Sequence, residues 1–382
     1  MAEAEADGPR TRGGLSSQEG RQTALAGAGK VELMLPAYVT DPSRERCGRD
    51  NAIEATAGYL QAVIAPLCRD GGPYALLDFP DHSNVGDSAI FLGELVLLRR
   101  LFGRNPSFVS SGSMFRKGWG RHTHFAGTIF IHGGGNLGDL WPGSQRYRES
   151  VMRDNRHIKT IQLPQSIHFN DQENLQQFSR IVGMHEDFTL LVRDRKSYSI
   201  ACENFDCTVL MCPDAAYGLG RLERNRNPEL PVLSLIRTDH ETTGEDISKI
   251  REYGPVQDWL DDGRRVKSLA DRLMRRVMYM TGEEGNFLMP RLLNQFVRMA
   301  EQRVARGINI LSRAEFVVSD RLHAHIMSSL LGLPHAALDN NYGKISNFID
   351  SWPLDSFTRR VKNIDEAIAV MSAGMGPCRR TR

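Results

Sequence analysis

The stretch Asp320-Arg321-Leu322-His323 places a cation and a titratable group at one predicted helix start. It follows the apolar run Phe316–Ser319 and precedes AHIMSSLLGL, which predicts a strand followed by a helix. In the first helical turn the helix dipole favours neutral histidine, and it repels Arg321 unless an anion is also present. We therefore predict an anion site with an acid–base group at His323. His325 points roughly the other way, and we interpret it as a packed core histidine.

Further cations follow other apolar runs. Arg193 comes directly after Phe188–Val192, and Arg237 comes after the run VLSLI. The planar guanidinium group binds carboxylates and phosphates through two parallel hydrogen bonds. Arg195 is an alternative to Arg193 as the anion ligand, because a strand end can expose either residue. A cluster of solvated charges without a ligand is the other interpretation of this segment. Lys344, in the polar loop NNYGK, adds one more cation.

Two similar turns have the pattern N-x-G-D. They are Asn84-Val85-Gly86-Asp87 and, behind a run of three glycines, Asn136-Leu137-Gly138-Asp139. We expect each to join a strand to a helix, where glycine permits a tight turn and the exposed N–H groups attract anions. Well-capped turns without a ligand are the alternative, and the sequence alone leaves both open. The candidate ligand contacts are Asn84, Asp87, Gly134, Gly135 and Asn136.

The segment Leu163–His168 reads LPQSIH. We expect a strand to end at Pro164, so that Gln165 and His168 follow its end. Polar groups in this position either meet a ligand or cap the next turn. The sequence favours neither.

Several well-known motifs of catalytic, metal and nucleotide sites do not occur in the sequence. It contains no H-E-x-x-H pattern and no cysteine cluster, so no metal site is predicted. It also has no G-x-S-x-G elbow, no phosphate loop of the G-x-x-x-x-G-K-[ST] type and no G-x-G-x-x-G fingerprint.

Short apolar runs alternate with helical patterns, which predicts an α/β fold built from parallel βαβ units. The runs GGGNLGD and Ile308–Leu311 are expected to be a loop and a strand, respectively. A charged stretch over about 239–285 is interpreted as a surface insertion. The predicted divisions are a disordered tail over 1–48, an N-terminal Rossmann-like domain over 49–220, a linker over 221–231, a C-terminal Rossmann-like domain over 232–373 and a tail over 374–382.

The composition narrows the class of protein. The 382 residues include 48 Lys and Arg against 46 Asp and Glu, a formal net charge of +2. This balance excludes a strongly basic nucleic-acid binder. No run approaches the roughly 18 apolar residues of a membrane span, and the first 30 residues lack the apolar core of a signal peptide. Six cysteines without a C-x-x-C pair favour a reduced, cytoplasmic protein.

The motifs NVGDSAI, HGGGNLGDLW, PQSIHF, RDRKSY, CPDAAY and SDRLHAHIMSSLLGLP…DNNYGK occur in an order that resembles the polysaccharide pyruvyltransferase family. The resemblance covers about residues 74 to 352. It implies two Rossmann-like α/β/α domains facing a cleft, in an arrangement like that of GT-B glycosyltransferases. It also implies transfer of pyruvate from phosphoenolpyruvate to a sugar diol as a ketal, with release of phosphate, during synthesis of an exopolysaccharide or cell-surface polysaccharide.

The resemblance also implies roles for individual residues. The Arg-Leu-His stretch of the family maps onto Arg321, Leu322 and His323, and its Arg-Asp motif maps onto Arg193 and Asp194. His323 is then the general acid or base, and the two arginines clamp the donor. Arg237 and Lys344 are further substrate cations, and the glycine turn at 133–136 positions either the acceptor or a phosphate.

No cofactor is expected besides phosphoenolpyruvate as donor substrate, and the involvement of a divalent cation stays open. The expected partners are phosphoenolpyruvate and a saccharide acceptor, with lipid-linked acceptors included. Nucleic acid is not expected, whereas peripheral association with the inner membrane and homo-oligomers are left open. The alternatives are a glycosyltransferase with a nucleotide-sugar donor and a non-catalytic glycan-binding member of a polysaccharide assembly complex.

Overall fold

Seven strands form the first sheet, which is parallel throughout the described residues. The order is β2-β1-β3-β5-β6-β7, and β4 pairs additionally with β5. The strands are β1 (Tyr74–Leu77), β2 (Phe108–Ser110), β3 (Thr128–Ile131), β4 (Gly134–Gly138), β5 (Thr160–His168), β6 (Phe188–Val192) and β7 (Thr208–Met211). Every residue of β1, β3 and β6 is buried, as expected for parallel strands covered on both faces.

Helices cover both faces of this sheet. One face packs residues of α2 (Gly48–Ile64), α3 (Val85–Phe102) and α9 (Met289–Ser312) into one apolar cluster. The opposite cluster includes residues of α5 (Pro142–Asp154), α6 (Gln172–Gly183) and α7 (Arg195–Asn204). The part of the chain that forms the first sheet also contains two short 3-10 helices, η3 (Ala65–Cys68) and η4 (Ala215–Leu219).

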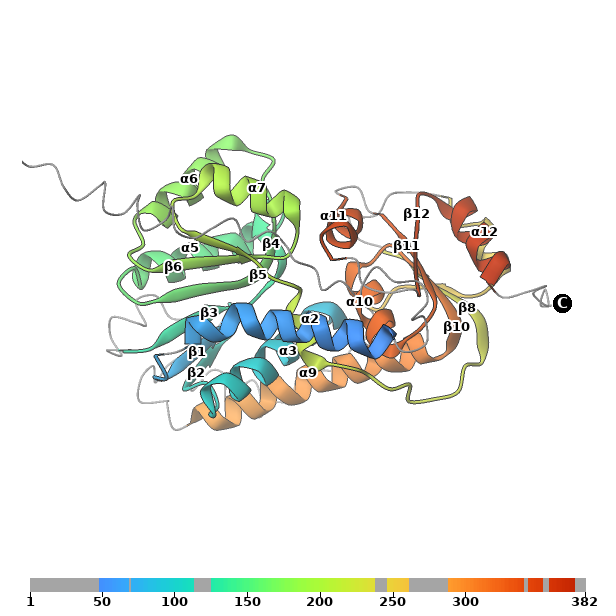
Figure 1. Ribbon diagram of the computed structural model, residues 1–382, viewed down its shortest axis with the longest axis horizontal. Helices are drawn as coiled ribbons and strands as arrows, with labels where there is room; N and C mark the ends of the chain where they lie inside the picture. Colours follow the sequence, from blue (N-terminus) through green and yellow to red (C-terminus); the bar gives the residue numbers. More distant parts are fainter. Residues whose placement is uncertain are drawn as a thin grey trace, which may run out of the picture. The chain divides into compact units, whose positions relative to one another are not determined.

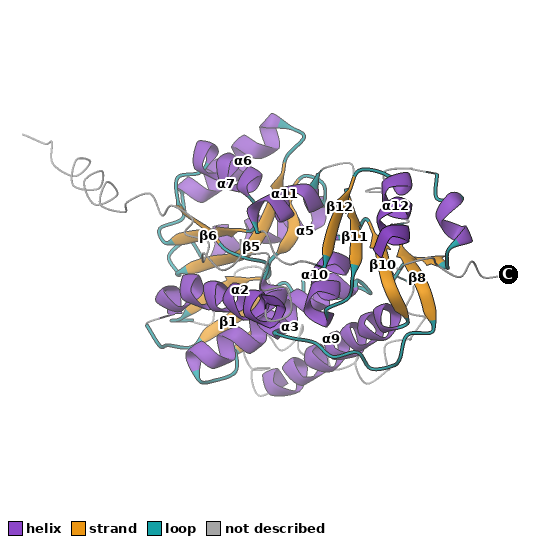
Figure 2. Ribbon diagram, turned by 45° about the vertical axis from the view of Figure 1, so that its right-hand side comes forward, coloured by secondary structure: helices purple, strands orange, loops and turns teal. Residues whose placement is uncertain are grey.

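The second sheet has the order β12-β11-β10-β8-β9 and is also parallel. Figures 1 and 2 show helices on both of its sides, with α10 and α12 lying opposite each other. Its elements are β8 (Leu230–Leu235), η5 (Lys249–Glu252), β9 (Val256–Gln257), β10 (Ala314–Ser319), α10 (Leu322–Leu331), β11 (His335–Leu338), α11 (Lys344–Ser351), β12 (Thr358–Val361) and α12 (Ile364–Gly374). Two parallel sheets flanked by helices confirm the predicted α/β class.

This computed structural model describes residues 48–68, 70–112, 125–237, 246–260, 288–339, 343–352 and 357–374. The predicted N-terminal tail up to 47, most of the predicted insertion and the tail from 375 lie outside these residues. Among the described helices, none is long and apolar enough to cross a membrane.

Helix α9 connects the two sheets. The ring of Phe296 in α9 stacks on Phe79 with the centroids 4.0 Å apart, and the chain then continues directly into β10 of the second sheet. Residues Pro42–Arg382 form one compact unit. The domain boundaries drawn at 221–231 therefore stay a prediction.

Two predicted elements are wrong. Ile308–Leu311 belongs to α9 and is not a strand, because the buried positions Phe296, Ala300, Val304, Gly307 and Leu311 continue a helical period. GGGNLGD is not only a loop, because Gly134–Gly138 forms β4. The backbone of Gly134 has φ 124°, a conformation that glycine adopts without a steric penalty.

The course of β5 also differs from the prediction. The strand continues through Pro164 to His168, and its register against β6 shifts between Gln162 and Gln165. Proline removes one ladder donor, so an irregularity of this kind is where a strand accommodates it. Gln165 and His168 consequently lie within the strand and not beyond its end.

Candidate active site

A buried carboxylate connects two predicted site residues. Asp214 Oδ2 lies 2.5 Å from Arg193 Nη1 and 3.4 Å from His323 Nε2. Asp214 follows β7 and is fixed by accepting the N–H of Ala216 at 2.9 Å. Burial raises the pKa of Asp214, but the charges of His323 and Arg193 outweigh it and hold that pKa well below its ordinary value. The cluster is therefore an ionised acid between a guanidinium and an imidazole.

Arg193 lies at the carboxyl end of β6 and points into the protein. Its Nε donates to Ser166 Oγ at 2.9 Å, and that hydroxyl donates to Asp194 Oδ2 at 2.7 Å. Trp352 Nε1 donates to the carbonyl oxygen of Arg193 at 2.7 Å. Arg195, by contrast, is the exposed first residue of α7. Of the two competing arginines, Arg193 therefore lies in the cluster with Asp214 and Arg195 lies outside it.

Arg321 is the N-cap residue of α10 and is buried. Its Nη2 donates to Asp258 Oδ2 at 2.6 Å, and both side chains are almost fully covered. The anion that the helix dipole requires beside this arginine is therefore present as the carboxylate of Asp258. Asp258 lies 63 positions away, after β9, and no local motif marks it.

The ring of His323 packs against the first turn of α3. A Cβ atom added to Gly86 would lie 2.5 Å from the His323 ring, so only glycine permits this approach. The first N-x-G-D turn therefore brings the starts of α3 and α10 together.

We expect Gly86→Ala to lower the turnover number by about 10²-fold, because a displacement of a reacting group by about 1 Å has this effect. The added methyl group collides with His323 and pushes it away from Asp214. Turnover under saturating substrate measures the effect. Gly58→Ala is the control, because nothing lies within 4 Å of the added carbon. Normal turnover in Gly86→Ala would contradict the close packing.

Asp87 belongs to the same cluster. Asn84 caps α3 by accepting the N–H of Gly86, and its Nδ2 donates to Asp87 Oδ2 at 2.9 Å. Burial raises the pKa of Asp87, but the charges of His82, His323, His132 and Arg193 lower it below its ordinary value. Asn84 and Asp87 thus lie where the turn motif predicted a site.

A pocket of about 400 Å³ adjoins Asp87. Its lining includes Asp78, Asp81, His82, His132 and Asn136. Asp78 has φ 69°, a left-handed backbone conformation that costs a non-glycine residue about 1 kcal/mol or more. Burial raises the pKa of Asp78, and the charges of His132, Arg148 and His82 only partly offset it.

The second N-x-G-D turn has a different role from the first. Gln165 accepts the N–H of Asn136 at 3.1 Å and donates to Asn136 Oδ1 at 2.9 Å, which fixes the start of β4 beside the pocket. Gly134 and Gly135 belong to this strand. Asp139 caps no helix here, because it accepts the N–H groups of Asn170 and Asp171.

His168 is not brought into the cluster. Its Nε2 lies 3.0 Å from Asn170 Oδ1, at the end of β5. His325, as predicted, is a packed core histidine, and its Nδ1 lies 2.8 Å from His335 Nε2.

The other two predicted cations, Arg237 and Lys344, belong to the part of the chain that forms the second sheet. The backbone N–H of Arg237 donates to Asp320 Oδ1 at 2.8 Å. Lys344 begins α11, and its side chain lies outside the described residues. Asp320 is buried beside Arg321, and its Oδ2 has no hydrogen-bond partner among the described residues. Burial raises the pKa of Asp320 to about 6, although the N–H and charge of Arg237 and the charge of Arg321 lower it in part.

We expect Asp320→Asn to raise the free energy of unfolding by about 1–3 kcal/mol at pH 7.5. A raised pKa means that the folded protein loses stability as the pH rises from about 4 through about 6, where Asp320 ionises. Asparagine keeps the acceptor for Arg237 and carries no charge. Urea unfolding at pH 7.5 and pH 4 measures the effect, and a gain that is equal at both values would contradict it.

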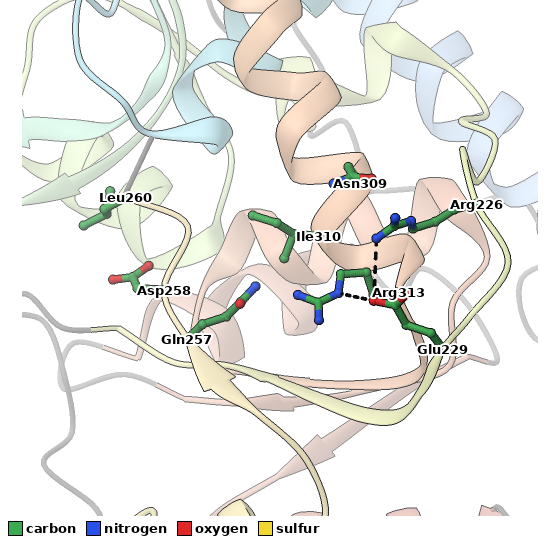
Figure 3. A pocket seen from close by; sticks show the side chains of 8 residues that line it. All are labelled: Arg226, Glu229, Gln257, Asp258, Leu260, Asn309, Ile310 and Arg313. Atoms are coloured by element: carbon green, nitrogen blue, oxygen red, sulfur yellow. Dashed lines mark hydrogen bonds and ion pairs between the residues drawn. The ribbon is translucent and has the colours of Figure 1, made fainter. Parts of the chain in front are cut away.

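A second pocket, of about 730 Å³, is shown in Figure 3. Arg313 and Arg226 both point to Glu229 there, with Nε of Arg313 2.8 Å from its Oε1. The side chain of Glu229 thus pairs with both arginines of this pocket. Asp258 lines this pocket and also accepts a hydrogen bond from Arg321.

Among the described residues, no group of three or more His, Cys, Asp or Glu side chains could hold a metal ion.

Comparison with known proteins identifies the family. Residues 84–342, more than half of the chain, match the family described as polysaccharide pyruvyl transferase. The chain belongs to this family. Its members transfer pyruvyl groups on polysaccharides, so the chain is a transferase.

Relatives within the family cover most of the chain. It is 32% identical to pyruvyl transferase 1 of Schizosaccharomyces pombe, over 78% of this chain and 75% of the relative. It is 30% identical to a Bacillus subtilis protein named for pyruvyl transfer, EpsO, over 72% and 84% of the two chains. An uncharacterized protein from Klebsiella pneumoniae has a similar fold, with TM-score 0.53, 16% identity and coverage of 79% and 98%.

Sequence reasoning missed several residues of this cluster and of the neighbouring pocket. Asp214 belongs to the motif CPDAAY, but the motif alone does not show that its carboxylate lies beside both Arg193 and His323. His132 ends the apolar run TIFIH directly before the three glycines, a signal that could have been used. Its partner Glu94 lies within α3 without any local signature.

Proposed function

We propose that the protein transfers pyruvate from phosphoenolpyruvate to a sugar diol as a ketal, with release of phosphate. One observation carries this proposal: His323 shares the Asp214 carboxylate with Arg193 and lies two positions after Arg321 at the start of α10. An acid–base group thus accompanies two guanidinium groups that are each fixed by a carboxylate. Phosphoenolpyruvate carries a carboxylate and a phosphate, which such groups bind well.

The reaction needs a proton at the methylene carbon of the donor. In the proposed sequence His323 supplies it, the electron pair of the double bond forms the new C–H bond, and C2 becomes electron-poor. One sugar hydroxyl then bonds to C2 through an oxygen lone pair. The second hydroxyl does the same as the C2–O bond to phosphate breaks, and its electron pair leaves with the phosphate. One of the two hydroxyl protons restores His323, and the other leaves with the phosphate.

Asp214 has a supporting role in this proposal. Its ionised carboxylate lies 3.4 Å from Nε2 of His323 and fixes the guanidinium of Arg193. Asp258 does the same for Arg321. Each donor cation is therefore oriented before the substrate arrives, which lowers the cost of binding and reaction.

The finer setting of the reaction is also part of this proposal. The two parallel sheets support two Rossmann-like halves in a GT-B-like arrangement, with the reaction between α3 and α10. We place the reaction in the cytoplasm, because the six cysteines without a C-x-x-C pair favour a reducing compartment. This setting fits acceptors that belong to an exopolysaccharide or cell-surface polysaccharide, including lipid-linked acceptors. It also fits peripheral contact with membrane machinery and the formation of homo-oligomers.

Donor dependence tests the proposal. Purified protein is incubated with galactose-, glucose- and mannosamine-containing acceptors and with either phosphoenolpyruvate or nucleotide sugars, and product masses are measured. We expect one acceptor to gain the mass of a pyruvate ketal with phosphoenolpyruvate alone. A gain of a hexose from a nucleotide sugar, without any response to phosphoenolpyruvate, would support a glycosyltransferase instead. No product with any donor would favour a non-catalytic glycan-binding protein.

A further inference from the structure

The pocket beside Asp87 is lined by carboxyl groups, whereas the donor cluster contains arginines. Asp78, Asp81 and Asp87 supply carboxyl groups to its lining, together with polar groups of Asn136 and Ser144. Among the described lining residues there is no lysine or arginine. The hydroxyl groups of a neutral sugar can donate to these carboxyl oxygens.

A histidine in this lining is held by a second buried carboxylate. Glu94 Oε2 lies 2.7 Å from His132 Nδ1, and Glu94 Oε1 accepts the N–H of Gly133 at 2.7 Å. His132 is 2% exposed and Glu94 is 1% exposed. This contact fixes the orientation of the ring, as a carboxylate does for a histidine in acid–base catalysis.

The other ring nitrogen is available for a ligand. His132 Nε2 is buried and has no hydrogen-bond partner among the described residues, although the ring lines the pocket. A buried polar atom of this kind requires an explanation, because leaving it unsatisfied costs about 1–3 kcal/mol. Burial lowers the pKa of His132, but the charge and hydrogen bond of Glu94 outweigh it and raise that pKa.

The pocket also adjoins the proposed donor site. The carboxylate of Asp87 lines the pocket and interacts electrostatically with His132, His323 and Arg193. A sugar in the pocket would therefore present its hydroxyl groups to a donor held at the arginines.

We infer that this pocket binds the acceptor diol and that His132, oriented by Glu94, accepts the proton of the first attacking hydroxyl at Nε2. The inference rests on the proposed function. In this step the hydroxyl oxygen bonds to C2 of the donor, the O–H bond breaks, and its proton moves to Nε2 of His132. His132 then passes this proton to the departing phosphate, and the proton of the second hydroxyl restores His323. His132 is then a catalytic residue, and Glu94 is a positioning residue.

Chemical rescue tests the role of His132. We expect His132→Ala to lower ketal formation by about 10²- to 10⁴-fold, the range for loss of a general base. Added imidazole should restore part of this loss, because it can occupy the space of the missing ring. His185→Ala is the matched control, because His185 is a buried histidine beside Phe188, outside the cluster.

Glu94→Gln tests the positioning role. We expect kcat to fall by about 10-fold or more with an unchanged KM for phosphoenolpyruvate. The ¹⁵N NMR signals of the His132 ring should show a changed tautomer. In wild-type protein, the Nε2 signal should shift on addition of the active acceptor and not on addition of inorganic phosphate.

The outcomes separate this inference from the proposed function. An active wild-type protein whose His132→Ala variant keeps full activity, or is not restored by imidazole at all, would overturn the inference alone. A wild-type protein without phosphoenolpyruvate-dependent product would overturn both. Rescue together with the acceptor-dependent NMR shift would support both.

Discussion

His323→Asn is expected to lower ketal formation by about 10²- to 10⁴-fold while the protein stays folded, because it removes the group that protonates the donor. Asparagine is shorter than the imidazole ring, whose Nε2 lies 3.4 Å from Asp214, and it cannot deliver a proton at neutral pH. Only 11% of the His323 side chain is exposed and its ring packs against Gly86, so the substitution also removes some packing, which the unfolding curve measures. Initial rates at saturating donor and acceptor, together with a thermal unfolding curve, measure both effects.

His168→Asn is the matched control for this variant. His168 contacts Asn170 and lies outside the cluster of Arg193, Asp214 and His323. The same substitution there should change the rate by less than about 2-fold, because substitutions away from such features have little effect. Equal rates for the two variants would contradict an acid–base role for His323.

Asp214→Asn is expected to lower the free energy of unfolding by about 3–5 kcal/mol at pH 7.5, because it leaves the buried charge of Arg193 without its counter-ion. The substitution should also lower turnover, since both Arg193 and His323 lose their orientation. The pKa of Asp214 is lowered in the folded protein, so its stabilisation is present above the unfolded pKa of about 3.9 and is lost at lower pH. Urea unfolding at pH 7.5 measures the full effect.

An exposed ion pair provides the control for Asp214. Asp365 Oδ1 lies 2.8 Å from Lys249 Nζ, but 61% of the lysine and 68% of the aspartate side chain are exposed. Asp365→Asn should therefore change the stability by less than about 1 kcal/mol. If Asp214→Asn lowers the free energy of unfolding no more than Asp365→Asn does, the buried Arg193–Asp214 pair does not stabilise the fold as we expect.

The parts of the fold with a strong local signal were predictable. Buried runs such as Thr128–Ile131 and Phe188–Val192 form strands because short apolar segments between turn residues have few alternatives. The capped turn at Asn84 and the helix after Arg321 also lie where the sequence indicated. These features depend on neighbours within a few residues.

The errors came from signals that local sequence cannot resolve. The three apolar residues within 308–311 fit a strand or one face of a long helix, and only the packing of α9 on α3 decides between them. Glycines at 134–138 indicate a loop by composition, but pairing with β5 makes them a strand. Tertiary contacts overrode the local preference in both cases.

The acidic partners of the site were the least predictable part. Arg321 and Asp258 are 63 positions apart, and Arg193 and Asp214 are 21 apart, so no periodicity links them. The dipole argument required an anion beside Arg321 but could not say that the protein supplies it. A net charge of +2 likewise conceals this local pairing of arginines with carboxylates.

The most direct test measures phosphate release and ketal formation in the same reaction. Wild-type protein, phosphoenolpyruvate and the active acceptor should yield one phosphate for each ketal, and both products should fall together in His323→Asn. Ketal formation without equal phosphate release, or transfer of a sugar from a nucleotide donor in place of pyruvate, would contradict the proposed reaction.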